Sequence, residues 1–156
     1  MGARPGLDGL SATAFPSGVM TMPIEATEHT GPITIWRKEL RPDSGGDGAH
    51  RGGLGQIIEI EPAPGHEFDF SAMFDRVNHP AKGRDGGKPG AAGSVALDDG
   101  TVLKPKGWQH VPAGRRLILH LPGGGGFGDP AQRSDAERQA DLTKGYVTDP
   151  AKGETA

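Results

Sequence analysis

Residues 122–130 read Pro-Gly-Gly-Gly-Gly-Phe-Gly-Asp-Pro, and the rest of the chain can be understood around this stretch. It follows residues 115–121, in which three leucines alternate with the period of two that is typical of a half-buried strand. Ordering a backbone costs roughly 1–2 kcal/mol per residue, and glycine loses the most freedom. A fixed loop of four glycines therefore needs its backbone close to a ligand or another chain. The alternative is a flexible connector, which the flanking prolines and Phe127 disfavour.

The composition predicts a single domain with a thin core. The chain has 156 residues, of which 27 are glycine and 14 are proline. This share is close to the level at which disorder becomes a reasonable interpretation, but the net charge of −3 is small for a disordered chain. Leu, Ile, Val and Phe number 28, few for a domain that should bury roughly 68–70% of its unfolded surface. We therefore expect an irregular β domain that completes its core against a partner.

The sequence also excludes several classes of partner. There is no cysteine, which rules out disulfides and is compatible with a reducing cytosol. No apolar run approaches the 18 residues of a membrane span, and the N-terminal residues lack the apolar core of a signal peptide. Acidic and basic residues are interspersed, so no nucleic-acid-binding surface is expected. The expected location is cytoplasmic.

Strand patterns dominate the chain. Runs of β-branched, aromatic and alternating apolar residues predict strands at 33–40, 56–61, 68–74, 94–97, 101–103 and 115–121. The first two look like an antiparallel hairpin with a long glycine-rich loop. Ser134 and Glu137 form a capping-box pattern that predicts the one helix, at about 135–143. The fold class is therefore mainly β: an irregular antiparallel sheet domain with long glycine-rich loops and one short C-terminal helix.

We divide the chain into an extended leading segment at residues 1–18, a β domain at 19–147 and a frayed tail at 148–156. The β domain carries three glycine-rich loops. We hypothesise that these loops converge on one edge of the sheet.

Some motifs have the spacing of known sites without the required context. Residues 43–46 (Asp-Ser-Gly-Gly) are similar to the nucleophile region of chymotrypsin-like proteases, but too few residues precede Ser44 for that fold. Glycines at 123, 125 and 128 match the dinucleotide-binding spacing, but no parallel strand and acidic residue follow. In a phosphate-binding Walker loop, the essential lysine would fall at Asp129, whose charge repels phosphate. Neither a serine nucleophile nor a nucleotide loop is favoured.

Other charged residues carry weaker hypotheses. The six histidines show no HxH or HExxH spacing, so no metal site is expected in this chain. A basic run at residues 82–88 could receive an anion, although such runs are usually solvated. Arg51 and Arg76 lie beside a glycine loop or at a strand end, where a guanidinium can hold several carbonyls or a carboxylate. For Asp75-Arg76 we favour a loop-holding role over catalysis.

Three motifs follow one another along the chain: residues 41–55 (RPDSGGDGAHRGGLG), Asp75-Arg76 before a proline and a glycine-rich loop, and residues 122–130. Together they resemble the C-terminal part of the hydantoinase B/oxoprolinase family. Phe15-Pro16-Ser17-Gly18 and Pro23-Ile24-Glu25 fit the same pattern. The resemblance spans roughly residues 15–147.

The resemblance implies a function within a complex. Members of the family work with a hydantoinase A-type subunit that uses ATP with Mg, and together they hydrolyse cyclic amides such as hydantoins, oxoproline or lactams. Related complexes carboxylate ketones. A full hydantoinase B subunit is several times longer, and its metal-binding region lies in the N-terminal part that this sequence lacks. The implied partners are therefore that N-terminal part, the A-type subunit and a cyclic amide or ketone, and any divalent metal belongs to the full complex.

The resemblance also suggests roles for the glycine loop. We expect the backbone N–H groups of the loop to stabilise an oxyanion or a phosphorylated oxygen; the residues concerned are Gly123, Gly124, Gly125, Gly126 and Gly128. Arg51 and Asp129 would hold the loop, and no residue is assigned as catalytic. The alternative is a non-catalytic assembly module, or a fragment inactive alone. Gly125→Val is expected to separate loss of turnover from loss of assembly.

Overall fold

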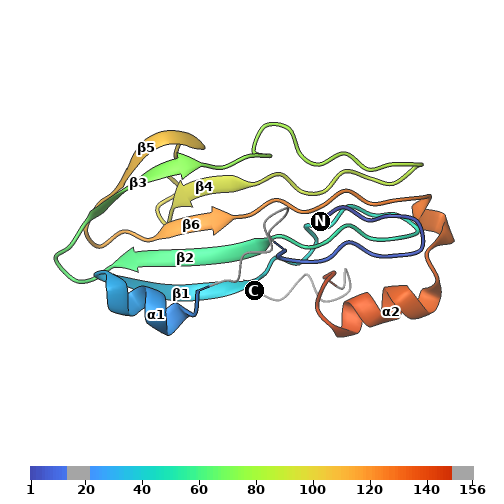
Figure 1. The fold of residues 1–156 in the computed structure, drawn as a ribbon, viewed down its shortest axis with the longest axis horizontal. Coiled ribbons are helices and arrows are strands. Elements are labelled where there is room, and N and C mark those ends of the chain that lie inside the picture. The colour runs from blue at the N-terminus through green and yellow to red at the C-terminus, as the bar shows by residue number, and fades with distance from the viewer. Residues whose placement is uncertain (14–21, 149–156) are drawn as a thin grey trace.

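The computed structural model describes residues 1–13 and 22–148 of the chain. The Phe15–Gly18 motif and the tail from residue 149 lie outside the described residues. The described part is mainly β, as expected (Figure 1). Its elements in chain order are α1 (Ile24–Thr30), β1 (Ile33–Leu40), β2 (Gln56–Pro62), β3 (Phe68–Met73), β4 (Ser94–Leu97), β5 (Lys106–Val111), β6 (Leu117–His120), the 3-10 helix η1 (Pro130–Gln132) and α2 (Asp135–Thr143).

Four strands form the main sheet, in the order β1-β2-β6-β4, and every neighbouring pair is antiparallel. β1 and β2 pair from Ile33 opposite Pro62 to Leu40 opposite Gln56, with a bulge between Ile35 and Arg37. This pairing confirms the predicted hairpin with a long loop. The loop that joins the two strands carries the first of the glycine-rich motifs.

A second sheet of two antiparallel strands, β3 and β5, packs against the first. The buried core cluster lies between them and consists of Val95, Leu97, Val111, Leu117 and Leu119. The phenylalanines of β3 are partly buried and pack against this cluster. The core is thin for a chain of 156 residues, as the composition predicts.

Two elements differ from expectation. The helix α1 was not predicted; it has no side-chain cap and no buried residue, so neither a capping pattern nor an apolar stripe marks it. A hydrogen bond of 2.7 Å from the Ile35 N–H to Glu28 ties the helix to β1. The strand β5 was also not predicted, because Gly107 interrupts its run of strand-forming residues. In the structure this glycine has a φ of +90°. Conversely, the strand expected at 101–103 contributes only an isolated bridge between Val102 and Ala96.

The three glycine-rich loops run side by side beyond one end of the main sheet (Figure 1). The Gly123 N–H donates to the Ala91 carbonyl at 3.1 Å, and the Ala91 N–H donates to the Ser44 carbonyl at 2.8 Å. One chain of bonds thus links all three loops, which confirms the hypothesised convergence. It occurs past the strand ends rather than along an edge strand. The extended N-terminal residues join the same bundle, since the Gly53 N–H donates to the Met1 carbonyl.

Candidate functional site

Four extended segments pack so closely that glycine is the one residue that fits where they touch. We call this set the glycine bundle; it comprises residues 1–9, 44–55, 81–91 and 122–128. A Cβ atom added at Gly52 would lie 2.0 Å from the Gly124 carbonyl oxygen. Such a Cβ at Gly125 would lie 2.1 Å from the Lys82 oxygen, and at Gly126 2.1 Å from the Asp47 oxygen. In each case the obstructing atom belongs to the backbone, so rotation of a side chain cannot relieve the clash.

The bundle is bonded through its own backbone. The Gly46 N–H donates to the Gly124 carbonyl at 2.8 Å, and the Gly124 N–H donates to the Gly53 carbonyl at 2.8 Å. Gly126 donates to Lys88 at 2.9 Å. Because each buried polar group needs a partner, these bonds fix the spacing of the segments. The glycine loop therefore has a close backbone contact, but the expected ligand or second chain does not provide it: the contact comes from other segments of its own chain.

This geometry bears on the expected oxyanion role. The N–H groups of Gly123, Gly124, Gly126 and Gly128 donate to the carbonyls of Ala91, Gly53, Lys88 and Arg84. While the bundle has this conformation, those four groups are not free to bind an oxyanion. The role of Gly123, Gly124, Gly125, Gly126 and Gly128 as an oxyanion loop stays a prediction, and for the four bonded groups it requires another arrangement of the bundle.

A buried ion network lies beside the bundle and includes Arg51. The Arg133 guanidinium donates to both oxygens of Asp8, at 2.9 and 2.8 Å, and to Asp141 at 2.7 Å. The Arg51 Nη1 donates to the Gly52 carbonyl at 2.6 Å, and its backbone N–H donates to Asp8 at 2.7 Å. The side chains of Arg51, Arg133 and Asp141 are 7%, 8% and 9% exposed. Two arginines and two aspartates balance each other in this network.

The network contains one imperfect contact. The Arg51 Nε lies 3.3 Å from an oxygen of Asp141, but it is buried and not aligned for a hydrogen bond. The guanidinium is covered by the Tyr146 ring, whose centroid is 5.1 Å from the Arg51 Cζ. The cation–π contact and the ion pair together hold Arg51 between the bundle and the C-terminal segment.

The charges of the network shift pKa values in the directions that stabilise ionised forms. Burial opposes ionisation of Asp8, but hydrogen bonds from the Arg133 side chain and the Arg51 N–H, with their charges, lower the pKa of Asp8 below its ordinary value. The hydrogen bond to Asp8 outweighs burial and raises the pKa of Arg133 above its ordinary value. Both groups stay charged throughout the physiological range.

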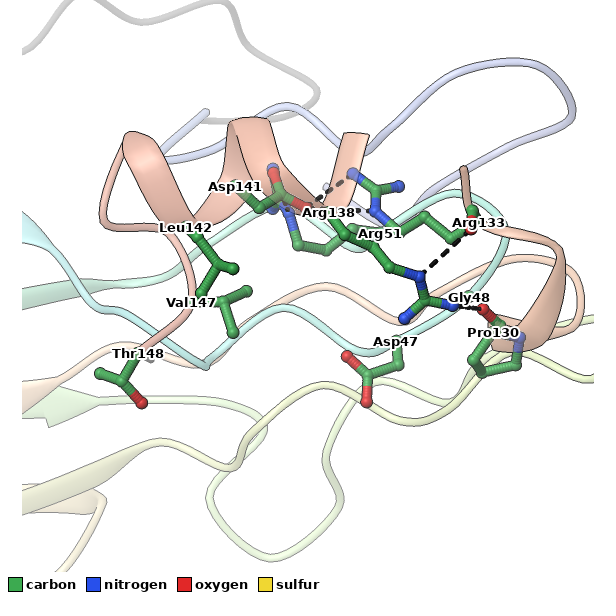
Figure 2. A pocket seen from close by; sticks show the side chains of 10 residues that line it. All are labelled: Asp47, Gly48, Arg51, Pro130, Arg133, Arg138, Asp141, Leu142, Val147 and Thr148. Carbon is green, nitrogen blue, oxygen red and sulfur yellow. Dashed lines mark hydrogen bonds and ion pairs between the residues drawn. The ribbon is translucent and has the colours of Figure 1, made fainter. Parts of the chain in front are cut away.

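A cavity of about 360 Å³ opens next to this network, between α2 and the loop at residues 47–48 (Figure 2). Leu142 and Val147 form its apolar wall, and Arg138 crosses the opposite side toward Asp47 (Figure 2). Arg138 donates to the carbonyls of Arg133 and Pro130. The lining carries charges of both signs, from three arginines and two aspartates.

The remaining residues of the expected site lie elsewhere. Asp129 caps the 3-10 helix by accepting a bond of 2.9 Å from the Ala131 N–H. Asp75 is exposed and pairs with Lys106 at 2.6 Å. Arg76 adopts a φ of +62°, which is uncommon for a non-glycine residue, and its carbonyl accepts from the Gly93 N–H at 3.1 Å. The structure thus places Arg51 and the glycine loop together, whereas Asp75 and Arg76 lie outside the bundle and share a hollow with Gly55 and Pro122 at its border.

Asp75 and Arg76 border a second hollow, of about 440 Å³. Its lining includes Met73, Gln56 and Leu121, together with Met1, Ala12 and Thr13 of the N-terminal segment. This hollow is where the end of β3 meets the glycine bundle.

Sequence reasoning missed three members of the ion network: Asp8, Arg133 and Asp141. The bond between Arg133 and Asp8 joins residues 125 positions apart. No local spacing in the sequence marks such a pair.

In residues 1–13 and 22–148, no group of three or more His, Asp or Glu side chains could hold a metal ion. Among the same residues, no helix is both long and apolar enough to cross a membrane.

The fold and the site define a mainly β domain that is held by a glycine-packed bundle and a buried ion network. The chain belongs to the hydantoinase B/oxoprolinase family, whose model matches residues 1–130. This finding confirms the resemblance drawn from the three motifs.

Individual relatives agree with this assignment. The chain is 32% identical over 170 residues to the caprolactamase subunit beta of Pseudomonas jessenii, covering 94% of this chain and 27% of that subunit. It is 38% identical over 113 residues to 5-oxoprolinase 1 of Arabidopsis thaliana, covering 70% of this chain and 9% of that protein. The chain therefore spans about a quarter, or less, of the length of these relatives.

Two solved structures share the fold. The crystal structure of the ATP-dependent caprolactamase from Pseudomonas jessenii aligns with a TM-score of 0.79 and 28% identity, over 94% of this chain and 27% of that one. A nucleotide-free structure of acetone carboxylase aligns with a TM-score of 0.77 over 98% of this chain and 25% of that one. At 21% identity the second likeness concerns the fold alone.

Proposed function

We propose that this chain forms the glycine-bundle domain of a hydantoinase B-type subunit, in an ATP-dependent complex that hydrolyses a cyclic amide such as a hydantoin, oxoproline or a lactam. Ketone carboxylation by the same type of complex is the alternative reaction. The observation that carries the proposal is the glycine bundle, because the family motifs at residues 41–55 and 122–130 pack against each other within it. In relatives of this family the matching segment is part of a much longer subunit.

In this proposal the loops of the domain close over a substrate pocket that is formed with the rest of the subunit, and no residue of the domain is assigned to the chemical step. ATP, Mg and any divalent metal are bound by the rest of the subunit and by an A-type partner. The bundle contributes a rigid surface, since its backbone bonds leave little freedom to the segments that form it. Arg51 positions that surface by joining the bundle to the C-terminal helix.

The test is reconstitution. The chain is combined with the remaining part of a hydantoinase B-type subunit and with its A-type partner, and ATP-dependent turnover of hydantoin, 5-oxoproline, caprolactam and acetone is measured. We expect turnover of one of these compounds that depends on both ATP and the chain. Full turnover in the complex without the chain refutes the proposal.

A second candidate is a non-catalytic assembly module, and the occupied N–H groups of the glycine loop favour it. Gly125→Val does not distinguish the two, because a Cβ at Gly125 would already collide with the Lys82 carbonyl and disturb the bundle. Arg76→Ala is a better variant, since its side chain is exposed and lies outside the bundle. Lost turnover with intact assembly assigns the hollow beside Arg76 to the active site, and unchanged turnover favours the assembly module.

A further inference from the structure

The outer face of the β3–β5 sheet carries large apolar side chains that the described part of the chain does not cover. Ser71 pairs with Trp108, and Met73 pairs with Lys106. Directly paired residues point to the same side of a sheet. Trp108 and Met73 therefore share one face, and each is 77% exposed.

The opposite face of the same strands is already used. Val111 and Ala72 are 0% and 1% exposed, and Phe68 and Phe70 pack against the core cluster. Trp108 and Met73 are thus not core residues turned outward, because the core-facing side of these strands is already buried. It is a property of the outward side, which we call the Trp108 face; it comprises Asp69, Ser71, Met73, Lys106, Trp108 and His110.

The other tryptophan of the chain provides a direct contrast. Trp36 is 59% exposed, but its indole N–H donates to Glu61 at 2.5 Å and the Arg116 guanidinium lies 5.1 Å from its ring centroid. Beyond its strand ladder, Trp108 has one hydrogen bond within the described residues, and that bond joins its backbone carbonyl to the Gln109 side chain. The Trp36 ring is therefore held by its own chain, whereas the described residues leave the Trp108 ring without a polar partner.

The Trp108 face has the layout of a binding surface. Its apolar centre is flanked by polar contacts: an ion pair of Lys106 with Asp75 at 2.6 Å at one end, and a hydrogen bond between His110 and Asp69 at 2.8 Å at the other. Tryptophan is enriched at the energetic centres of interfaces, and a polar rim is usual around them. Met73 also lines the hollow of about 440 Å³ beside Arg76, so the face continues into a recess that can receive a side chain.

We propose that the Trp108 face and the adjoining hollow dock the remainder of the hydantoinase B-type subunit. This inference rests on the proposed function. The length of a relative indicates which molecule occupies this face. The caprolactamase subunit beta matches this chain over only 27% of its own residues. Most of such a subunit therefore lies outside this domain and has to be positioned against it. The rim carries both signs of charge, which suits a folded polypeptide better than a membrane or a nucleic acid.

The test measures binding of the full 156-residue chain to the caprolactamase subunit beta of Pseudomonas jessenii from which the matching segment has been removed. We expect Trp108→Ala to raise the Kd by about 30-fold or more, as for an interface centre, and Met73→Ala to raise it by a smaller factor. Trp36→Ala is the matched control and should change the Kd less than about threefold. Equal effects of the two tryptophan substitutions, or no binding by the unchanged chain, overturn the proposal.

A second measurement reports on Trp108 directly. In a Trp36→Phe variant Trp108 is the one tryptophan left, because the chain has two. Its emission should shift to shorter wavelength when the subunit binds, and an unchanged spectrum in a formed complex overturns the proposal. If the spectrum shifts on concentrating the chain alone, the face is an interface between copies of this chain and the proposal also falls.

The two proposals can fail separately. Turnover that requires the chain but is insensitive to Trp108→Ala refutes the docking face and leaves the proposed function in place. Binding that depends on Trp108 without ATP-dependent turnover refutes the function and leaves the docking face.

Discussion

Gly123→Ala tests the central claim that backbone contact, rather than turn geometry, requires glycine in the bundle. The added Cβ would lie 1.6 Å from the Ser44 carbonyl oxygen, whereas real Cβ atoms essentially never approach within 3.0 Å. The segments must therefore separate by about 1.4 Å. Ser44 is fully buried, and its carbonyl also accepts the Ala91 N–H at 2.8 Å, so the shift breaks a buried bond.

The expected loss of stability follows from these contacts. Overpacking costs roughly 1–3 kcal/mol, and a buried backbone group left without its partner costs about 1–3 kcal/mol more. We expect Gly123→Ala to lower the free energy of unfolding by about 4 kcal/mol. For a chain of this size such a change corresponds to a Tm lower by about 10 °C. Urea unfolding of the full chain, followed by circular dichroism, measures it.

Gly31→Ala is the matched control. Its Cβ would meet nothing within 4 Å, and the residue has extended backbone with a φ of −157°. Its effect should stay within about 0.5 kcal/mol, as for an ordinary surface substitution. If Gly123→Ala is as mild as Gly31→Ala, the bundle does not require glycine by contact and the reasoning is wrong.

Three further predictions concern the ion network and α2. Asp141→Asn removes a charge that faces two buried arginines and should lower the free energy of unfolding by about 3 kcal/mol, measured by urea titration; a loss below about 1 kcal/mol would contradict the buried network. The pKa of Asp8 is lowered in the folded state, so its contribution is fully present above its ordinary value near 3.8 and is lost as the pH falls through the lowered folded value. In the Asp8→Asn variant the free energy of unfolding should therefore decrease less steeply as the pH falls in the acid range. The same decrease in the variant and in the unchanged protein would refute this role. Ser134→Ala removes the hydroxyl that accepts the Glu137 N–H and should cost about 1 kcal/mol, seen as faster amide exchange in α2, with unchanged exchange as the contrary result.

The sheet and the C-terminal helix could be predicted because their signals are local. The residues of β1 and β2 have strand composition, and the capping box at Ser134 marks the start of α2 within one residue. The helix α1 could not be predicted in this way, since it has no side-chain cap and no buried residue, and its Glu28 contact with β1 depends on the tertiary fold. The ion network was equally hidden, because pairing of Asp8 with Arg133 depends on the tertiary fold.

The glycine loop shows how far composition can lead. Four glycines in a row predict a close approach of backbone, and the structure has one at each of them. Glycine cannot specify whether the approaching group is a ligand, another protein or the same chain, because all three need only the absence of a Cβ atom. Here the chain itself provides the contact, with residues from Met1 to Gly126 within one bundle.

This outcome changes where a partner should be sought. A thin apolar core and costly loops suggest that another polypeptide must pack onto the glycines, yet those glycines already have backbone neighbours and backbone hydrogen bonds. The glycine bundle therefore stabilises the domain in place of a larger core, by close packing and by bonds of about 2.8 to 2.9 Å between segments. Trp108 and Met73 on the β3–β5 sheet are among the large apolar residues that stay exposed. Substitution of Trp108 should then weaken the binding of a partner more than substitution of any glycine that leaves the bundle folded.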